Sequence, residues 1–98
     1  MGENTRLDIE QINYNIIPSQ LANIIFSEIE KRWVGDDVEK FFNIWTRKEA
    51  VLKAYGTGFS DNAYIKTCLE TDNQNFKQFT YSKKILNTYY MSICLLKI

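Results

Sequence analysis

The stretch Trp45-Thr46-Arg47-Lys48-Glu49-Ala50-Val51-Leu52-Lys53, closed by Gly56-Thr57-Gly58, decides the fold of this chain. Around it, apolar side chains recur every three, four and seven residues, a spacing that predicts an amphipathic helix. These side chains are Val38, Phe41, Phe42, Trp45, Leu52 and Tyr55. The positions that would continue the apolar stripe hold Lys48 and Glu49, so the predicted helix places two ionisable groups in the face that it buries.

Charges at core-facing positions indicate a candidate site. Burying a carboxylate or an ammonium costs several kcal/mol unless the group is paired, bound to a metal or solvated in a cleft. Glu49 and Lys53 are four residues apart and therefore lie on one face of the helix, one turn from each other. The same spacing equally suits an exposed Glu–Lys pair that contributes about 0.3 to 0.5 kcal/mol to helix stability. From spacing alone, both interpretations stay open.

A second acidic pattern lies near the N-terminus, where apolar and acidic residues alternate in Leu7-Asp8-Ile9-Glu10. In a strand, this alternation sends Leu7 and Ile9 to the core and the two carboxylates together to the other face. Their backbones would lie about 6.6 to 6.8 Å apart, close enough for both side chains to reach one cation. A half-solvated strand with an acidic outer face is the commoner meaning of an Asp-x-Glu pattern.

Between these motifs the sequence predicts a first helix that ends before the long one begins. Pro18-Ser19 gives a stop followed by an N-cap, and helical spacing then continues to about Trp33. Gly35 ends this helix, and Asp36 or Asp37 can cap the next one.

The remainder of the chain reads as strands. Two segments, 63–70 and 76–83, flank a polar turn at 71–75, and a third strand covers 88–98 after Asn87. The sequence therefore predicts an α+β fold in a single domain, 1–98: a short N-terminal strand, two helices, and a three-stranded antiparallel meander packed on the long helix.

Charge and composition exclude several classes of protein. Lysine plus arginine equals aspartate plus glutamate at 12 each, so no net field favours nucleic acid or a lipid surface. No apolar run approaches the length of a membrane span. The chain has two cysteines, Cys68 and Cys94, and no histidine, which argues against zinc. We expect a cytoplasmic protein in which both cysteines pack as small hydrophobes.

Three separated motifs follow one another along the chain. They are Leu7-Asp8-Ile9-Glu10, then Ile25-Phe26-Ser27 with Glu30, then Phe42-x-x-Trp45-Thr46-x-Lys48-Glu49-Ala50-x-x-Lys53 with Gly56-x-Gly58. In content and order they resemble the 4'-phosphopantetheinyl transferase superfamily. The segment Tyr90-Met91-Ser92-Ile93-Cys94 is similar to the last strand of the C-terminal half of the Sfp-type enzymes.

The resemblance implies a Mg²⁺-dependent enzyme, a holo-[acyl-carrier-protein] synthase. Such enzymes move the phosphopantetheine arm of coenzyme A onto a serine of an apo acyl or peptidyl carrier protein. By analogy, Asp8, Glu10 and Glu49 hold the metal, because Mg²⁺ prefers a few carboxylates together with substrate phosphates. Glu49 also helps to deprotonate the serine, Lys53 offsets phosphate charge, and Lys48 is a second phosphate contact.

The chain departs from the Sfp-type pattern in ways that bear on its partners. Those enzymes contain two related halves, and this chain resembles only the second. It lacks the histidine of the first half, and Arg6 stands where the family usually has a glycine. The active form would therefore be a homo-oligomer or a complex with a missing N-terminal half. The alternative is a catalytically incomplete paralogue that binds a carrier protein or coenzyme A.

Overall fold

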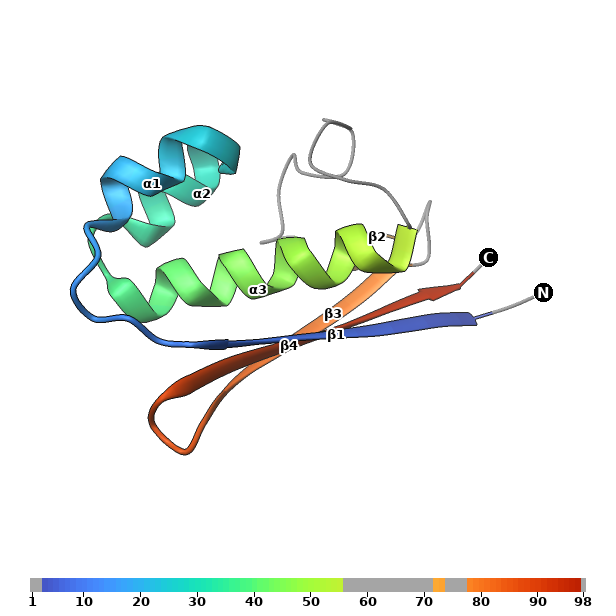
Figure 1. Cartoon of the computed structure of the whole chain (residues 1–98). Helices are drawn as coiled ribbons and strands as arrows, with labels where there is room; N and C mark the ends of the chain where they lie inside the picture. Colours follow the sequence, from blue (N-terminus) through green and yellow to red (C-terminus); the bar gives the residue numbers. More distant parts are fainter. Residues whose placement is uncertain (1–2, 56–71, 74–77, 98) are drawn as a thin grey trace.

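The computed structural model describes residues 3–55, 72–73 and 78–97. Its elements are β1 (Glu3–Gln11), α1 (Pro18–Ile25), α2 (Glu28–Val34), α3 (Val38–Tyr55), β2 (Asp72–Asn73), β3 (Gln78–Ile85) and β4 (Tyr89–Lys97). The strands form one antiparallel sheet in the order β1-β4-β3-β2. Helix α3 runs along one face of the sheet, and α1 and α2 lie together at one of its ends (Figure 1). This arrangement confirms the predicted α+β fold.

The hairpin between β3 and β4 sets the register of the sheet. Leu86 and Asn87 both have positive φ, at 54° and 61°, and the Thr88 N–H donates to the Ile85 carbonyl at 3.2 Å. These two consecutive residues of positive φ reverse the chain within a three-residue loop, 86–88, which leaves Ile85 opposite Tyr89. The turn aligns Ser82 with Ser92, and β1 then pairs with β4 so that Asp8 lies opposite Ser92.

The faces of β1 are the reverse of the prediction. Asp8 is buried at 5% exposure, whereas Leu7 and Ile9 are 46% and 50% exposed. The alternation of β1 separates the acidic and apolar side chains as expected, but α3 covers the acidic side. Alternation alone defines two faces of a strand without saying which one the helix covers, and a polar patch under α3 made the acidic face the inner one.

That patch is a chain of hydroxyl groups between α3 and the sheet, of which Thr46 and Ser92 are buried and Ser82 is half-buried. The Thr46 Oγ1 lies 2.6 Å from the Ser92 Oγ, which lies 2.6 Å from the Ser82 Oγ. Thr46 also donates to the Phe42 carbonyl at 2.8 Å, and the Arg47 Nε donates to Ser82 at 2.6 Å. Because each hydroxyl has a partner, the polar groups are buried at little cost and fix the height of α3 above β4.

The predicted first helix is two helices. Phe26 is extended between them, and Ser27 begins α2 with a capping box: its Oγ accepts the Glu30 N–H at 3.2 Å, and Glu30 accepts the Ser27 N–H at 2.8 Å. Helical spacing runs through this break, but the Ser-x-x-Glu pattern starts a new helix within it. Gly35 ends the helix, as predicted. Its φ is 54°, a conformation that glycine adopts readily because it has no Cβ.

The two predicted N-caps have different outcomes. The expectation for Ser19 is wrong: α1 already begins at Pro18, a residue favoured in the first helical position, and the Ser19 N–H donates to the Asp36 carboxylate at 3.3 Å. Of the two aspartates proposed for α3, Asp37 is the cap, and its Oδ1 accepts the Lys40 N–H at 3.0 Å.

The predicted strands at 76–83 and 88–98 correspond to β3 and β4, and the first strand corresponds to β1. Asp72–Asn73, predicted as part of a turn, pairs with β3 as the short strand β2. The predicted strand 63–70, the Gly56-Thr57-Gly58 segment and Cys68 lie outside the described residues. Cys94 is fully buried, and burial raises the pKa of its thiol to about 11, as expected for a cysteine that packs as a hydrophobe.

Aromatic rings join the helices to one another. The Phe41 ring stacks on Phe26 at 5.2 Å between ring centroids and on Trp45 at 6.1 Å, and it meets Phe42 edge-on at 5.3 Å. The surrounding core also contains Ile12, Ala22, Val34 and Ile44. This cluster holds α1 and α2 on the first half of α3, leaving its second half to face β1 and β4.

We expect Trp45→Ala to lower the free energy of unfolding by about 3 kcal/mol, since the ring is partly buried against this core. Urea denaturation measures the loss. Trp33→Ala is the matched control, because the Trp33 ring is 37% exposed and its removal opens a smaller cavity. Equal losses in the two variants would show that Trp45 is not part of the core.

Candidate functional site

Strand β1 and the second half of α3 bring four predicted site residues to one place. The Lys53 Nζ lies 2.9 Å from the Asp8 Oδ1 and 3.2 Å from the Leu7 carbonyl oxygen. The Asp8 side chain is 7% exposed and that of Lys53 is 47% exposed, so the ion pair joins a buried carboxylate to an amine at the surface. Lys53 thereby ties α3 to β1 while about half of its side chain remains exposed.

Glu10 and Glu49 complete this acidic cluster, which consists of Asp8, Glu10 and Glu49. Partial burial raises the pKa of the Glu49 carboxyl most, and the charges of Asp8 and Glu10 raise it further, against the effect of Lys53. Burial and Asp8 likewise raise the pKa of Glu10. The three carboxylates are therefore close enough to repel one another, and one lysine does not neutralise them.

The acidic cluster has the chemistry of a magnesium site. The Asp8 Oδ2 is buried and has no hydrogen-bond partner among the described residues, although the other oxygen of the carboxylate is paired with Lys53. A hard divalent cation would satisfy the Oδ2 and relieve the repulsion among the three carboxylates. In the part of the chain that the structure describes, no three His, Cys, Asp or Glu side chains are placed so that they could hold a metal ion together. The metal-binding roles of Asp8, Glu10 and Glu49 thus stay a prediction.

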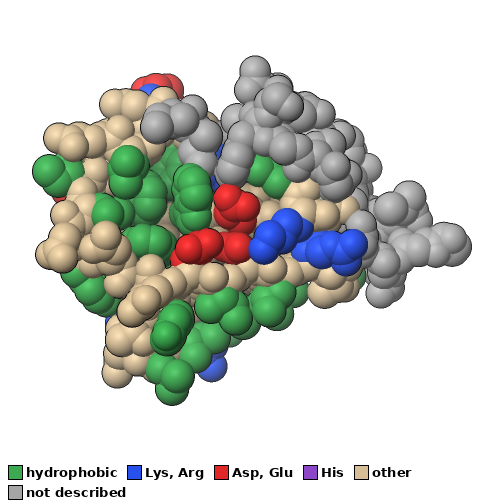
Figure 2. Space-filling model, viewed as in Figure 1, with side chains coloured by type: hydrophobic (Ala, Val, Ile, Leu, Met, Phe, Trp, Pro, Cys, Tyr) green, Lys and Arg blue, Asp and Glu red, His purple; other side chains and the backbone are tan. Residues whose placement is uncertain are grey.

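Acidic and basic side chains meet on one accessible face of the molecule (Figure 2). Figure 2 shows acidic side chains grouped near the centre of this face, directly beside basic ones and bordered by hydrophobic side chains. Opposite charges that share one open surface suit a ligand that carries both a cation and phosphate groups.

Lys48, the fifth predicted site residue and the second predicted phosphate contact, has a different environment. Its side chain is 0% exposed, and its Nζ lies 2.8 Å from the Glu30 Oε1, whose side chain is also 0% exposed. The Nζ is 5.9 Å from the centre of the Phe26 ring. Lys48 therefore joins α3 to α2 inside the protein, and its contact with phosphate stays a prediction.

Sequence reasoning assigned no role to Glu30 or to the hydroxyl groups of Thr46, Ser82 and Ser92. Glu30 could have been found from the Ser-x-x-Glu capping box, which fixes the glutamate at the start of a helix. The hydroxyl chain has no comparable pattern, because its members meet only once β3, β4 and α3 are assembled. These residues support the site by fixing where α2 and α3 lie.

The raised pKa of Glu49 predicts how stability depends on pH. A carboxyl whose pKa is raised by folding destabilises the folded state when it is ionised, and this penalty disappears as pH falls below the unfolded pKa, 4.5. We expect Glu49→Gln to melt at or above the wild-type temperature at neutral pH, and the difference to vanish by about pH 4. Thermal melts of the two proteins between pH 7 and about pH 4 test this expectation. If the difference in melting temperature grows as the pH falls, folding does not raise the pKa of Glu49.

Comparison with known proteins agrees with this geometry. No helix of the described residues is long and apolar enough to span a membrane. A search of the curated proteins finds no match. The family model of the 4'-phosphopantetheinyl transferase superfamily, ACPS, matches residues 7–94, which include the second half of β1, the helices α1, α2 and α3, the strand β3 and most of β4. The chain belongs to the 4'-phosphopantetheinyl transferase superfamily.

Proposed function

We propose that residues 1–98 form one cytoplasmic domain that transfers the 4'-phosphopantetheine arm of coenzyme A to a serine of an apo acyl or peptidyl carrier protein. The observation that carries this proposal is the meeting of Asp8, Glu10, Glu49 and Lys53 on one face, within the segment matched by the superfamily model. Carboxylates beside an amine suit phosphoryl transfer, which depends on positioning and on stabilisation of phosphate charge.

In the proposed reaction the serine oxygen forms a bond to the phosphorus that carries the pantetheine arm. The bond from that phosphorus to the nucleotide oxygen breaks, and adenosine 3',5'-bisphosphate leaves. Glu49 accepts the serine proton, a role that its raised pKa supports, because the carboxylate of a weaker acid binds a proton more readily. Lys53, whose side chain is about half exposed, offsets charge on the phosphate.

Mg²⁺ held by Asp8, Glu10 and Glu49 would supply Lewis-acid stabilisation of the pyrophosphate. The protein's own task at this site is to hold the three carboxylates beside Lys53, through the Asp8–Lys53 pair and the hydroxyl chain under α3. Lys48 serves as a phosphate contact in this proposal only if its ammonium leaves Glu30 when substrate binds.

Intact mass spectrometry tests the proposed transfer. The chain is incubated with coenzyme A, Mg²⁺ and an apo carrier protein, and the carrier is expected to gain the mass of one phosphopantetheine arm. A carrier with its acceptor serine replaced by alanine is the control, and chelation of Mg²⁺ should stop the reaction. If neither a fatty-acid nor a peptide-synthase carrier gains mass, while the chain is folded and assembled, the proposed transfer is wrong.

The outer face of the sheet supports a proposed homo-oligomer or a complex with a complementing N-terminal half. Leu7, Ile9, Tyr81 and Tyr89 are 38% to 58% exposed there, on strands that pair directly with β4 or belong to it. Neighbouring apolar residues on one exposed sheet face are typical of an interaction surface. Light scattering should show self-association that Ile9→Lys weakens and Ile29→Lys, on α2, does not. A fully active, strictly monomeric chain would contradict this proposal.

A catalytically incomplete paralogue is the second candidate. It is favoured by the absence of histidine in the whole chain and by Arg6 in the place of the family's glycine. Such a protein would bind coenzyme A or a carrier protein and leave the carrier mass unchanged. Isothermal titration with coenzyme A, with and without Mg²⁺, run beside the transfer assay separates it from an active enzyme.

A further inference from the structure

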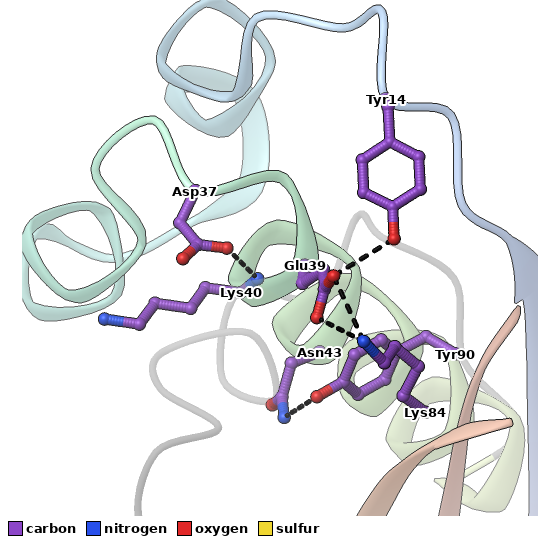
Figure 3. A network of polar contacts seen from close by, with 7 residues as sticks. All are labelled: Tyr14, Asp37, Glu39, Lys40, Asn43, Lys84 and Tyr90. Atoms are coloured by element: carbon purple, nitrogen blue, oxygen red, sulfur yellow. Dashed lines mark hydrogen bonds and ion pairs between the residues drawn. The ribbon is translucent and has the colours of Figure 1, made fainter. Parts of the chain in front are cut away.

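A groove of about 610 Å³ lies beside the start of α3, and neither Asp8 nor Lys53 lines it. It is bounded by the first turns of α3, the end of α2, the segment after β1, and β4. Three aromatic side chains, Tyr14, Trp33 and Tyr90, give it apolar walls. Its charged and polar residues form the network drawn in Figure 3, with Lys84 at its edge.

The charged groups of the groove already have partners. The Glu39 carboxylate accepts the Tyr14 hydroxyl at 3.0 Å and the Lys84 ammonium at 3.1 and 3.2 Å. The Asp37 carboxylate caps α3 through the Lys40 N–H, and the Lys40 ammonium lies 5.0 Å from the centre of the Trp33 ring. Since the charges are balanced within the protein, the groove is not built to attract a strongly charged ligand.

Two neutral groups of the groove, the Asn43 side-chain amide and the Tyr90 hydroxyl, can each form a further hydrogen bond. The Asn43 Nδ2 donates to the Tyr90 hydroxyl oxygen at 3.2 Å (Figure 3). The Asn43 Oδ1 is buried and has no partner among the described residues, so it lacks a donor. Tyr90 accepts with its oxygen and retains its own O–H hydrogen to donate. The groove is thus lined by a buried acceptor with a donor beside it, between aromatic walls.

We propose that this groove binds a neutral secondary amide, whose N–H donates to the Asn43 Oδ1 and whose carbonyl accepts the Tyr90 hydroxyl. An amide offers a donor beside an acceptor with no net charge, which is the complement of this pair, and a buried acceptor without a donor costs free energy that such a ligand recovers. Tyr90 is paired directly with Glu10 across β4 and β1, so the groove adjoins the acidic cluster.

The amide source rests on the proposed function. Coenzyme A carries two secondary amides in its pantetheine arm, and a molecule extended from the acidic cluster past Glu10 would bring one of them to Tyr90. The adenine of the same molecule also offers a donor beside an acceptor. Pantetheine and adenosine therefore serve as separate probes, and pantetheine is the expected ligand.

The test follows the side-chain amide resonance of Asn43 in a ¹⁵N–¹H spectrum while pantetheine is added without Mg²⁺ or a carrier protein. We expect a saturable shift that Tyr90→Phe weakens about tenfold, since the ring is kept and only the donor is lost. Tyr89→Phe is the matched control on the adjacent position, where the side chain points to the other face of the sheet, and it should leave the affinity unchanged.

A second variant guards against misfolding. Asn43→Leu keeps the size of the side chain and removes the acceptor, and its binding is followed by calorimetry after thermal melting has shown that it folds. The proposal is overturned if Asn43→Leu retains the affinity for pantetheine or if Tyr89→Phe weakens binding as much as Tyr90→Phe does. It is also overturned if the Asn43 resonance shows no saturable shift, which is the result expected if water alone satisfies the Oδ1. Binding of adenosine in place of pantetheine would overturn the choice of an amide. Pantetheine binding without transfer would overturn the proposed function alone.

Discussion

Glu49→Gln is expected to slow phosphopantetheine transfer by about 10² to 10⁴-fold, the usual contribution of a positioned acid–base group. Glutamine keeps the shape of the side chain but accepts no proton and binds a divalent cation weakly. The loss should appear in kcat with little change in the KM for the carrier protein, because the carboxylate acts on the reacting serine. Initial rates measured by intact mass at saturating coenzyme A give this comparison.

The folded state should survive this change, which separates a chemical role from a structural one. Burial and the charges of Asp8 and Glu10 raise the pKa of Glu49, so removing its charge relieves repulsion and leaves no cavity. Glu28→Gln is the matched control, since it removes an exposed carboxylate from α2. Normal transfer by Glu49→Gln in an oligomeric, Mg²⁺-loaded preparation would remove Glu49 from the proposed mechanism.

The sequence predicted the elements better than the way they pack. Periodicity found β1, β3, β4 and α3 because each repeat reflects local backbone geometry. It assigned the wrong face of β1 to the core. Helix α3 packs on the face that carries Asp8 because hydroxyl groups from β3, β4 and α3 line the interface there, and periodicity within β1 does not record them. The exposed apolar face of Leu7 and Ile9 follows from the same reversal.

In the candidate site, too, the sequence predicted which helix face each residue occupies better than which distant residue it contacts. The spacing of Glu49 and Lys53 predicted a shared helix face, and Lys53 does approach β1 through Asp8. The spacing of Lys48 predicted a charge in the buried face, which is also correct. Its partner Glu30 is 18 residues away in sequence and reaches it only because Ser27 starts α2 at that point. Long-range pairs of this kind depend on how helices begin, which apolar periodicity does not record.

Lys48→Met is expected to lower the free energy of unfolding by about 3 to 5 kcal/mol. Its ammonium and the Glu30 carboxylate are 2.8 Å apart with both side chains 0% exposed, and removing the ammonium deprives a buried carboxylate of this ion pair. The loss should exceed the change caused by Lys31→Met, whose partner Glu28 is 81% exposed and regains water when the pair is broken. Urea denaturation of both variants measures this difference.

The double variant Lys48→Met with Glu30→Gln should regain most of the lost stability, because neither side chain of the pair is then charged and glutamine can still close the capping box with Ser27. A double variant as unstable as Lys48→Met alone would contradict a simple ion pair. With a folded double variant, the KM for coenzyme A tests the predicted phosphate contact separately from stability. A rise of about tenfold in the KM for coenzyme A supports the phosphate contact, because a residue that touches the substrate changes its binding even when the fold is restored. An unchanged KM limits Lys48 to joining α2 and α3.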